Sequence, residues 1–238
     1  MPSPPAHARR ARKTTKAARK PVRQAWPPYP NRVEAILLEL GRLYPSADCA
    51  LIRDDPFQLL CATILSAQCT DERVNMVTPG LFARFPTPTT MAKVPPAVLE
   101  SIIRSTGFFR NKTKNLIGAA RALDEKWGGK VPRSMNDLLE LPGVARKTAN
   151  VVLGTAFGIA EGVVVDTHVT RLSQRLGLTR ATAAEAIERD LIQILPRSRW
   201  ILFSHQIIWH GRRVCRARKP DCDACTLVPH CPGAFREA

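Results

Sequence analysis

The chain has 238 residues, enough to bury a substantial core in one large domain or two small ones. No apolar run approaches the length of a membrane span, so we expect a soluble protein with no membrane partner. The formal net charge of +16 at pH 7 excludes an acidic chain and favours a polyanionic partner, above all nucleic acid.

The first 25 residues are basic and contain no acidic side chain. They carry eight of the cations, at Arg9, Arg10, Arg12, Lys13, Lys16, Arg19, Lys20 and Arg23. A segment rich in Lys, Arg, Pro and Ala cannot bury enough apolar surface to fold alone, so we expect disorder over residues 1–28. It would be either an electrostatic arm that lengthens residence on DNA or a solvated tail with little effect.

The same segment bears on localisation. It lacks the apolar central region of a signal peptide, and its prolines and lack of an apolar face oppose a mitochondrial transit helix. We therefore expect a bacterial cytoplasmic protein associated with the nucleoid, with mitochondrial targeting as the alternative.

From residue 31 onward the pattern is helical. Asn31 is a candidate N-cap for a helix that ends near Tyr44, and Asp55 precedes an unusually apolar helix that should be central in the core. Val163–Val165 is the best strand candidate, but it is too short to build a sheet, so the predicted fold is all-α. Further helices are expected near residues 71–84, 96–105, 111–126, 134–140, 145–157, 166–176, 183–194 and 197–210.

Two adjacent phenylalanines, Phe108 and Phe109, occupy the turn that begins at Gly107. An exposed apolar side chain at such a tip could insert into a base stack and kink a duplex. The alternative is that both rings pack beneath the loop.

Residues 141–150 read Leu-Pro-Gly-Val-Ala-Arg-Lys-Thr-Ala-Asn and predict a helix-hairpin-helix. A short helix capped by Ser134 precedes them, Pro142 discourages its continuation, and Gly143 permits a tight turn. The second helix would present free backbone amides at its N-terminus, which is a ready site for a phosphate.

Lys147 falls in the first turn of that second helix, where the helix dipole and Arg146 both disfavour an ammonium. An amine nucleophile must be neutral, so this position suits nucleophilic catalysis. Asp166 precedes the next amphipathic run and is an N-cap candidate that would hold a carboxylate nearby. The alternative is a solvated lysine and a carboxylate that only caps a helix.

Four of the seven cysteines lie within residues 215–231, spaced Cys215-x6-Cys222-x2-Cys225-x5-Cys231. Such crowding indicates one inorganic centre better than a disulfide framework. Four thiolates suit structural zinc or a [4Fe–4S] cluster, and the single close pair favours iron–sulfur. The loop between the first two ligands is basic, so Arg218 and Lys219 are candidate phosphate contacts.

Three remaining cysteines lie outside this cluster and are predicted to be small core residues: Cys49, Cys61 and Cys69.

Taken together, residues 141–150, Val-Asp-Thr-His at 165–168, Leu-Ser-Ala-Gln at 65–68 and the cysteine spacing closely resemble the bacterial endonuclease III family. These are helix-hairpin-helix DNA glycosylases of base excision repair. The resemblance covers roughly residues 30–233. It implies a six-helix barrel domain with the hairpin (49–160) and a discontinuous [4Fe–4S] cluster domain (29–48 and 161–238), acting as a monomer on double-stranded DNA.

The resemblance also implies roles for single residues. Lys147 matches the nucleophile that attacks C1′ of a damaged pyrimidine nucleotide, and Asp166 matches the catalytic carboxylate. Gln68 matches the residue that fills the gap left by the flipped base, and Phe108 matches the wedge. Gly143, Ala145 and Arg146 fall in the DNA-binding hairpin, and His168 is expected to be structural. The substrates implied are oxidised pyrimidines and abasic sites.

Three positions depart from the family pattern. Ala145 replaces a usual glycine and could alter the hairpin if the position needs a positive φ. Phe108 replaces an aliphatic wedge, and Cys69 replaces a small residue.

Two rival functions remain open. One is a mismatch-specific adenine glycosylase or other monofunctional glycosylase, which is disfavoured because that adenine-specific family lacks the lysine at position 147. The other is a non-catalytic helix-hairpin-helix protein that binds only the DNA backbone.

Overall fold

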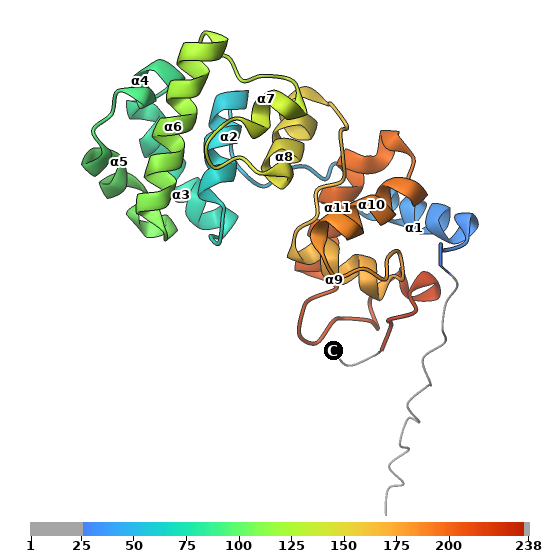
Figure 1. The fold of residues 1–238 in the computed structure, drawn as a ribbon. Helices are drawn as coiled ribbons and strands as arrows, with labels where there is room; N and C mark the ends of the chain where they lie inside the picture. Colours follow the sequence, from blue (N-terminus) through green and yellow to red (C-terminus); the bar gives the residue numbers. More distant parts are fainter. Residues whose placement is uncertain (1–25, 236–238) are drawn as a thin grey trace, which may run out of the picture.

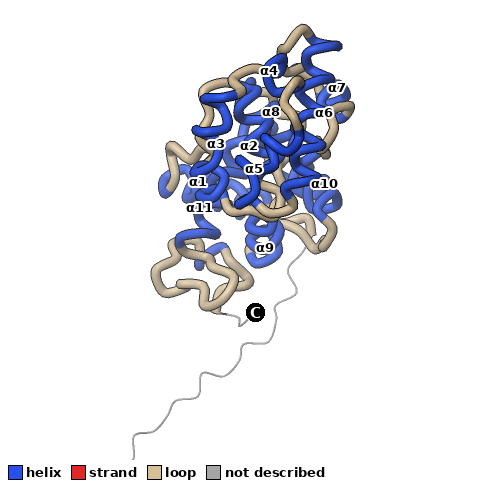
Figure 2. The backbone as a smooth tube through the Cα atoms, turned by 90° about the vertical axis from the view of Figure 1, so that its left-hand side faces the viewer, coloured by secondary structure: helices blue, strands red, loops and turns tan. Residues whose placement is uncertain are grey.

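The computed structural model describes residues 26–235, and the predicted basic segment 1–28 with its proposed roles falls almost wholly outside this range. Every regular element in the described part is helical, and none is a strand (Figure 2). The all-α prediction is therefore confirmed. Among these helices, none has both the length and the apolar character needed to cross a membrane.

Eleven α-helices and three short 3-10 helices follow one another in the described part of the chain. The α-helices are α1 (Pro30–Leu43), α2 (Pro56–Leu65), α3 (Asp71–Arg84), α4 (Pro88–Ala92), α5 (Pro96–Ile103), α6 (Phe109–Trp127), α7 (Met135–Leu139), α8 (Arg146–Phe157), α9 (Thr167–Arg175), α10 (Ala184–Ile194) and α11 (Trp200–Arg213). The 3-10 helices are η1 (Arg104–Thr106), η2 (Arg197–Arg199) and η3 (Val228–His230).

The buried side chains form two separate hydrophobic cores. One draws on α2 to α8, and the other on α1, α9, α10 and α11. Figure 1 shows the corresponding two lobes, with α2 to α8 in one and the first and last helices in the other. The first helix thus packs beside the last ones. The domain limits that we propose, 48/49 and 160/161, fall between the two sets of core residues.

Helix α2 is the centre of the first core, as its composition predicted. Eight of its ten residues are buried, and full burial of a Leu or Ile side chain contributes about 1.5–3 kcal/mol. Asp55 caps the helix through a hydrogen bond from the Gln58 amide to its carboxylate, at 2.8 Å. Cys61 is buried within this helix, and Cys49 and Cys69 pack partly buried against the same core.

Two local predictions differ from the structure. Helix α1 begins at Pro30 with Tyr29 at the N-cap, so the prediction of Asn31 as the cap is wrong. Proline at the first helical position has φ already near the helical value, which starts the helix earlier. Helix α4 was not predicted: its five residues are too few for an apolar period, and its cap at Thr87, unlike that of α7 at Ser134, was not identified. A reciprocal capping box between Thr87 and Thr90 stabilises it.

Candidate active site

The turn between α7 and α8 depends on one glycine. Gly143 has φ +80°, and a Cβ atom there would lie 2.7–2.8 Å from side-chain atoms of Asn115. Only glycine satisfies both the backbone conformation and this close approach. Ser134 caps α7 by accepting a hydrogen bond from the Asp137 amide at 3.2 Å, as predicted.

Ala145 is the N-cap of α8 and has φ −95° and ψ 171°. This is extended backbone that any residue adopts, so the alanine introduces no strain into the hairpin. Its side chain cannot accept hydrogen bonds, and no side-chain cap is present. The first amides of α8 therefore lack a side-chain acceptor, which leaves the helix N-terminus suited to an anion.

Lys147 and Asp166 lie in the wall of one cavity of about 110 Å³. Lys147 is exposed in the first turn of α8, which belongs to the first core, while Asp166 is the N-cap of α9, which belongs to the second. The Asp166 carboxylate accepts a hydrogen bond from the Val169 amide at 2.8 Å. Its helix-capping role is thus real, and it does not exclude a second role in the cavity.

Several other side chains line this cavity, and sequence reasoning did not single them out for it. Asp71, at the start of α3, forms an ion pair with Arg212 of α11. The indole of Trp209 donates a hydrogen bond to the Asp48 carbonyl at 3.0 Å. The lining also includes Cys49, Ala50, Leu51, Thr63, Ser66, Val151, Val164, Ser204, His205 and Ile208. These residues come from distant segments, so no local sequence signal could have found them.

Arg146, a predicted DNA contact, is engaged within the protein. Its guanidinium donates two hydrogen bonds to the Glu188 carboxylate of α10, at 2.9 and 3.1 Å. These bonds and the charge of Glu188 raise the pKa of Arg146. About half of the Arg146 side chain remains exposed. The residue therefore joins the hairpin to the second core.

Gln68 and Phe108 are both exposed at the tips of turns, and both have left-handed backbone conformations. Gln68 has φ +53° and Phe108 has φ +46°. Phe108 is 64% exposed, whereas Phe109 is partly buried against the first core. The two aromatic residues thus differ: one projects from the loop and the other packs beneath it.

His168 lies beside Arg171 and Gly211. Its Nδ1 atom is 3.2 Å from a guanidinium nitrogen of Arg171. Burial lowers the pKa of His168, although Asp166 acts in the opposite direction. The surroundings are those of a packed polar residue.

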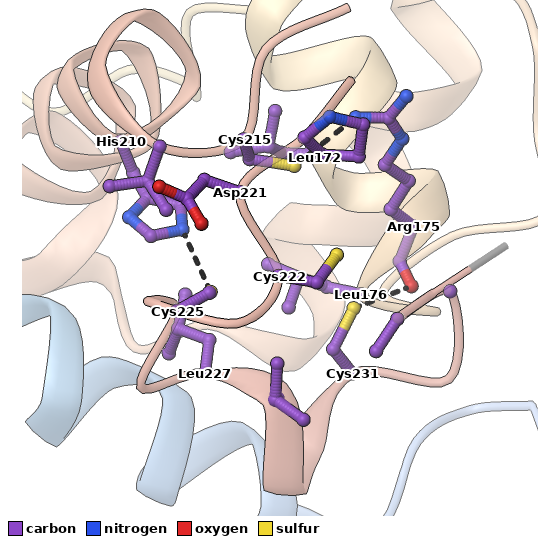
Figure 3. Close-up of a pocket in the computed structure, with 15 residues that line it drawn as sticks. Leu172, Arg175, Leu176, His210, Cys215, Asp221, Cys222, Cys225, Leu227 and Cys231 are labelled. Carbon is purple, nitrogen blue, oxygen red and sulfur yellow. Dashed lines mark hydrogen bonds between the residues drawn. The ribbon is translucent and has the colours of Figure 1, made fainter. Parts of the chain in front are cut away.

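The four clustered cysteines line one small cavity at the C-terminal end, shown in Figure 3. Three of their sulfur atoms are close to nitrogen atoms of other residues. Arg175 Nη1 is 3.3 Å from Cys215 Sγ, His210 Nε2 is 3.4 Å from Cys225 Sγ, and the Phe235 amide is 3.5 Å from Cys222 Sγ.

Burial raises the pKa of the fourth thiol, Cys231, to about 11. A metal centre that binds here must therefore displace a proton from this thiol. In the described part of the chain, no three His, Cys, Asp or Glu side chains are arranged to hold a single metal ion. Four thiols that line one cavity, three of them with a nitrogen atom nearby, are a donor set that an iron–sulfur cluster uses, so the residue types present fit such a group.

The basic loop after Cys215 is fixed by one arginine. Arg175 of α9 donates hydrogen bonds to the carbonyls of Arg216 and Ala217, at 2.7 and 3.0 Å. Arg218 and Lys219 are then exposed at the loop surface, and Lys219 has φ +52°. The loop therefore has a protein anchor besides any metal ligand.

Comparison with known proteins gives consistent results. Residues 61–197 match the family model described as HhH-GPD superfamily base excision DNA repair protein. Endonuclease III of Synechocystis sp. is 59% identical over 204 residues, which cover 86% of this chain and 93% of that protein. Endonuclease III of Bacillus subtilis is 41% identical over 202 residues, covering 84% and 92%.

Solved structures agree with these relatives. A trapped endonuclease III–DNA covalent intermediate superimposes with a TM-score of 0.82 at 42% identity, covering 87% of this chain and 97% of that one. A non-covalent endonuclease III–DNA complex gives the same TM-score and identity, covering 87% and 96%. A thermostable thymine-DNA glycosylase, at 20% identity and a TM-score of 0.76, covers 86% and 97% and shares the fold.

Proposed function

Because the chain belongs to the endonuclease III family, we propose that Lys147 and Asp166 carry out its chemistry in the cavity that they share. The enzyme is a bifunctional DNA glycosylase and AP lyase that acts on oxidised pyrimidines in base excision repair. The observation that supports the residue assignment is that an amine from α8 and a carboxylate from the N-cap of α9 line the same cavity.

In the proposed reaction, the damaged nucleotide is flipped out of the duplex so that its sugar approaches this cavity. The neutral amine of Lys147 attacks C1′, the bond from C1′ to the base breaks, and the base leaves with its bonding electrons and takes up a proton. Opening of the sugar ring gives a protonated Schiff base between Lys147 and C1′. Loss of a proton from C2′ then expels the 3′ phosphate and nicks the strand.

Asp166 either accepts a proton from the Lys147 ammonium or stabilises the positive charge that develops on the sugar. Its N-cap hydrogen bond fixes the carboxylate at the start of α9. A preorganised charge of this kind costs no reorganisation during the reaction.

The proposed DNA contacts are made by exposed groups of the hairpin and of the turns at Gln68 and Phe108. The turn at Gly143 would present the first amides of α8, which follow Ala145, to a backbone phosphate, and the exposed part of Arg146 would add a positive charge. Gln68 would enter the gap left by the flipped nucleotide, and Phe108 would wedge into the adjacent base stack.

We further propose that Cys215, Cys222, Cys225 and Cys231 hold a [4Fe–4S] cluster. Its contribution would be structural, because bound thiolates would fix both ends of the basic loop. Arg218 and Lys219 could then contact phosphates with little loss of side-chain and loop entropy.

The partner is double-stranded DNA with damaged pyrimidines or abasic sites, bound by a monomer. Bacterial relatives support a cytoplasmic, nucleoid-associated location.

The test is incubation with duplex DNA that carries one thymine glycol, with and without borohydride. We expect strand nicking and a borohydride-trapped covalent complex, both lost in Lys147→Ala. Lys130→Ala is the control, because Lys130 is exposed just after the C-terminal end of α6. Base release without trapping would support a monofunctional glycosylase, and binding without base release would support the non-catalytic alternative.

A further inference from the structure

Lys112 of α6 is a buried lysine outside the catalytic cavity. Its residue is 4% exposed, and its ammonium donates hydrogen bonds to two carbonyls, Leu65 O at 2.8 Å and Thr106 O at 2.7 Å. Lysine is almost never fully buried unless it is paired. Here the partners are main-chain oxygens from two segments that lie about forty residues apart in the sequence.

Each of these carbonyls lies a few residues before one of the exposed tips. Leu65 is the last residue of α2, and Gln68 follows it by three positions. Thr106 is the last residue of η1, and Phe108 follows it by two. One nitrogen atom therefore holds the bases of both tips within hydrogen-bond distance of itself.

The two tips need external support, because neither has a favourable backbone. Both Gln68 and Phe108 have positive φ, a left-handed conformation that is unfavourable for a residue with a side chain. Phe108 is also the N-cap of α6 and makes no side-chain capping hydrogen bond. Strained residues of this kind persist only where the surrounding structure fixes them.

Lys112 is suited to supply that support. The last turn of α2 contains no basic residue of its own, so Lys112 brings the cation that its C-terminal carbonyls favour. Its backbone amide also bonds the Phe108 carbonyl at 3.1 Å. Hydrogen bonds from a charged donor are stronger than neutral ones, and removing the donor leaves two carbonyls without this partner.

We propose that Lys112 is a positioning residue that holds the Gln68 and Phe108 tips in a fixed relation, so that both enter the duplex together when the damaged nucleotide is extruded. This proposal rests on the proposed function, in which the two tips occupy the gap and the adjacent step. Lys112 does not line the cavity of Lys147 and Asp166. Its loss should therefore weaken extrusion of the nucleotide and leave the amine chemistry intact.

The first experiment compares wild type, Lys112→Met and the control Lys130→Met at saturating protein. Methionine keeps most of the length of lysine and removes the donors. The DNA carries thymine glycol opposite 2-aminopurine, whose fluorescence rises when the base loses its stacking partners. We expect Lys112→Met to lose most of this rise and to process the duplex about tenfold more slowly, which corresponds to about 1.4 kcal/mol. Lys130→Met should match wild type.

A double-mutant cycle separates positioning from a general structural role. In a Gln68→Ala/Phe108→Ala background, Lys112→Met should cause little further loss of rate, because the groups that it positions are already gone. A loss that simply adds to that of the tip mutations would overturn the proposal. So would a fluorescence rise in Lys112→Met equal to that of wild type.

Two further measurements keep the outcome decisive. Thermal melting establishes that each variant is folded, and Lys112→Gln, which retains one donor group, replaces Lys112→Met if the latter does not fold and should give an intermediate fluorescence rise. If wild type neither nicks nor traps the lesion, the proposed catalytic function fails, but the fluorescence assay requires only binding and still tests Lys112.

Discussion

The guanidinium of Arg146 and the carboxylate of Glu188 form a bidentate ion pair between the two cores. The pair joins the first residue of α8 to the middle of α10, with Glu188 buried and Arg146 half exposed. Asn150, one turn further along α8, donates a third hydrogen bond to the same carboxylate at 2.9 Å. The helix that carries Lys147 is therefore fixed to the half of the molecule that carries Asp166.

Glu188→Ala should lower stability by about 2 kcal/mol, mainly because the buried Asn150 amide loses its acceptor. For a chain of this size the melting temperature should fall by about 4–8 °C. Glu185→Ala, at an exposed position on the same helix, should change stability by less than about 0.5 kcal/mol. Calorimetry measures the melting temperatures of both variants. Equal melting temperatures for Glu188→Ala and Glu185→Ala would show that the hydrogen bonds to Glu188 do not contribute to stability.

Gly143→Ala should damage the hairpin, whereas Ala145→Gly should not. The first change forces a Cβ atom into Asn115 at positive φ, and the second occurs at extended backbone. We expect Gly143→Ala to weaken binding to an abasic-site duplex at least about tenfold, or about 1.4 kcal/mol. Fluorescence anisotropy at one fixed salt concentration gives both affinities. Similar affinities for the two variants would contradict this account of the turn.

Asp166→Asn separates capping from chemistry. Asparagine caps helices about as well as aspartate, so the melting temperature should hardly change. The loss of the negative charge beside the reacting sugar should slow single-turnover base release by about 10²–10⁴-fold. A time course of samples quenched in the presence of borohydride, in which the trapped covalent complex is quantified, measures that rate. A large fall in stability with an unchanged rate would mean that Asp166 serves only as a cap.

Arg218→Ala and Lys219→Ala should each weaken DNA binding without regard to sequence. Each side chain is exposed on the loop anchored by Arg175, and we expect each to neutralise one phosphate. The slope of log affinity against log salt should fall in magnitude by about 1 per substitution. Lys130→Ala provides the control, since α6 extends about 28 Å from its N-terminal tip toward that residue. An unchanged slope in the loop variants would show that Arg218 and Lys219 do not contact DNA phosphates.

Acid should destabilise the protein partly through His205, which lines the same cavity as Lys147 and Asp166. Burial lowers the pKa of His205 below 6.5, although Asp48 acts in the opposite direction. The unfolded chain therefore binds this proton at a higher pH than the folded chain, and stability falls as the pH drops below about 6.5 toward the folded value. His205→Gln removes this contribution. When the pH is lowered from about 7.5 to about 5.5, the melting temperature should fall further for wild type than for His205→Gln.

The sequence by itself determined the features that arise within a few residues. The apolar composition of α2, the caps at Ser134 and Asp166, and the positive φ of Gly143 are properties of short segments, so the sequence pattern predicts them. The close approach of Asn115 to Gly143 is not such a property. The same reasoning missed α4, because five residues carry no usable period. It also misplaced the start of α1, because Pro30 rather than Asn31 sets the helix.

Only the tertiary structure decided which groups meet across the two cores. It added Trp209 to the cavity that Lys147 and Asp166 line, set Arg146 against Glu188, and brought the Lys112 ammonium to two carbonyls that precede separate tips. These contacts join segments tens of residues apart. They result from the packing of whole helices. The local sequence of a helix sets its own conformation but does not specify which distant residues its side chains will contact.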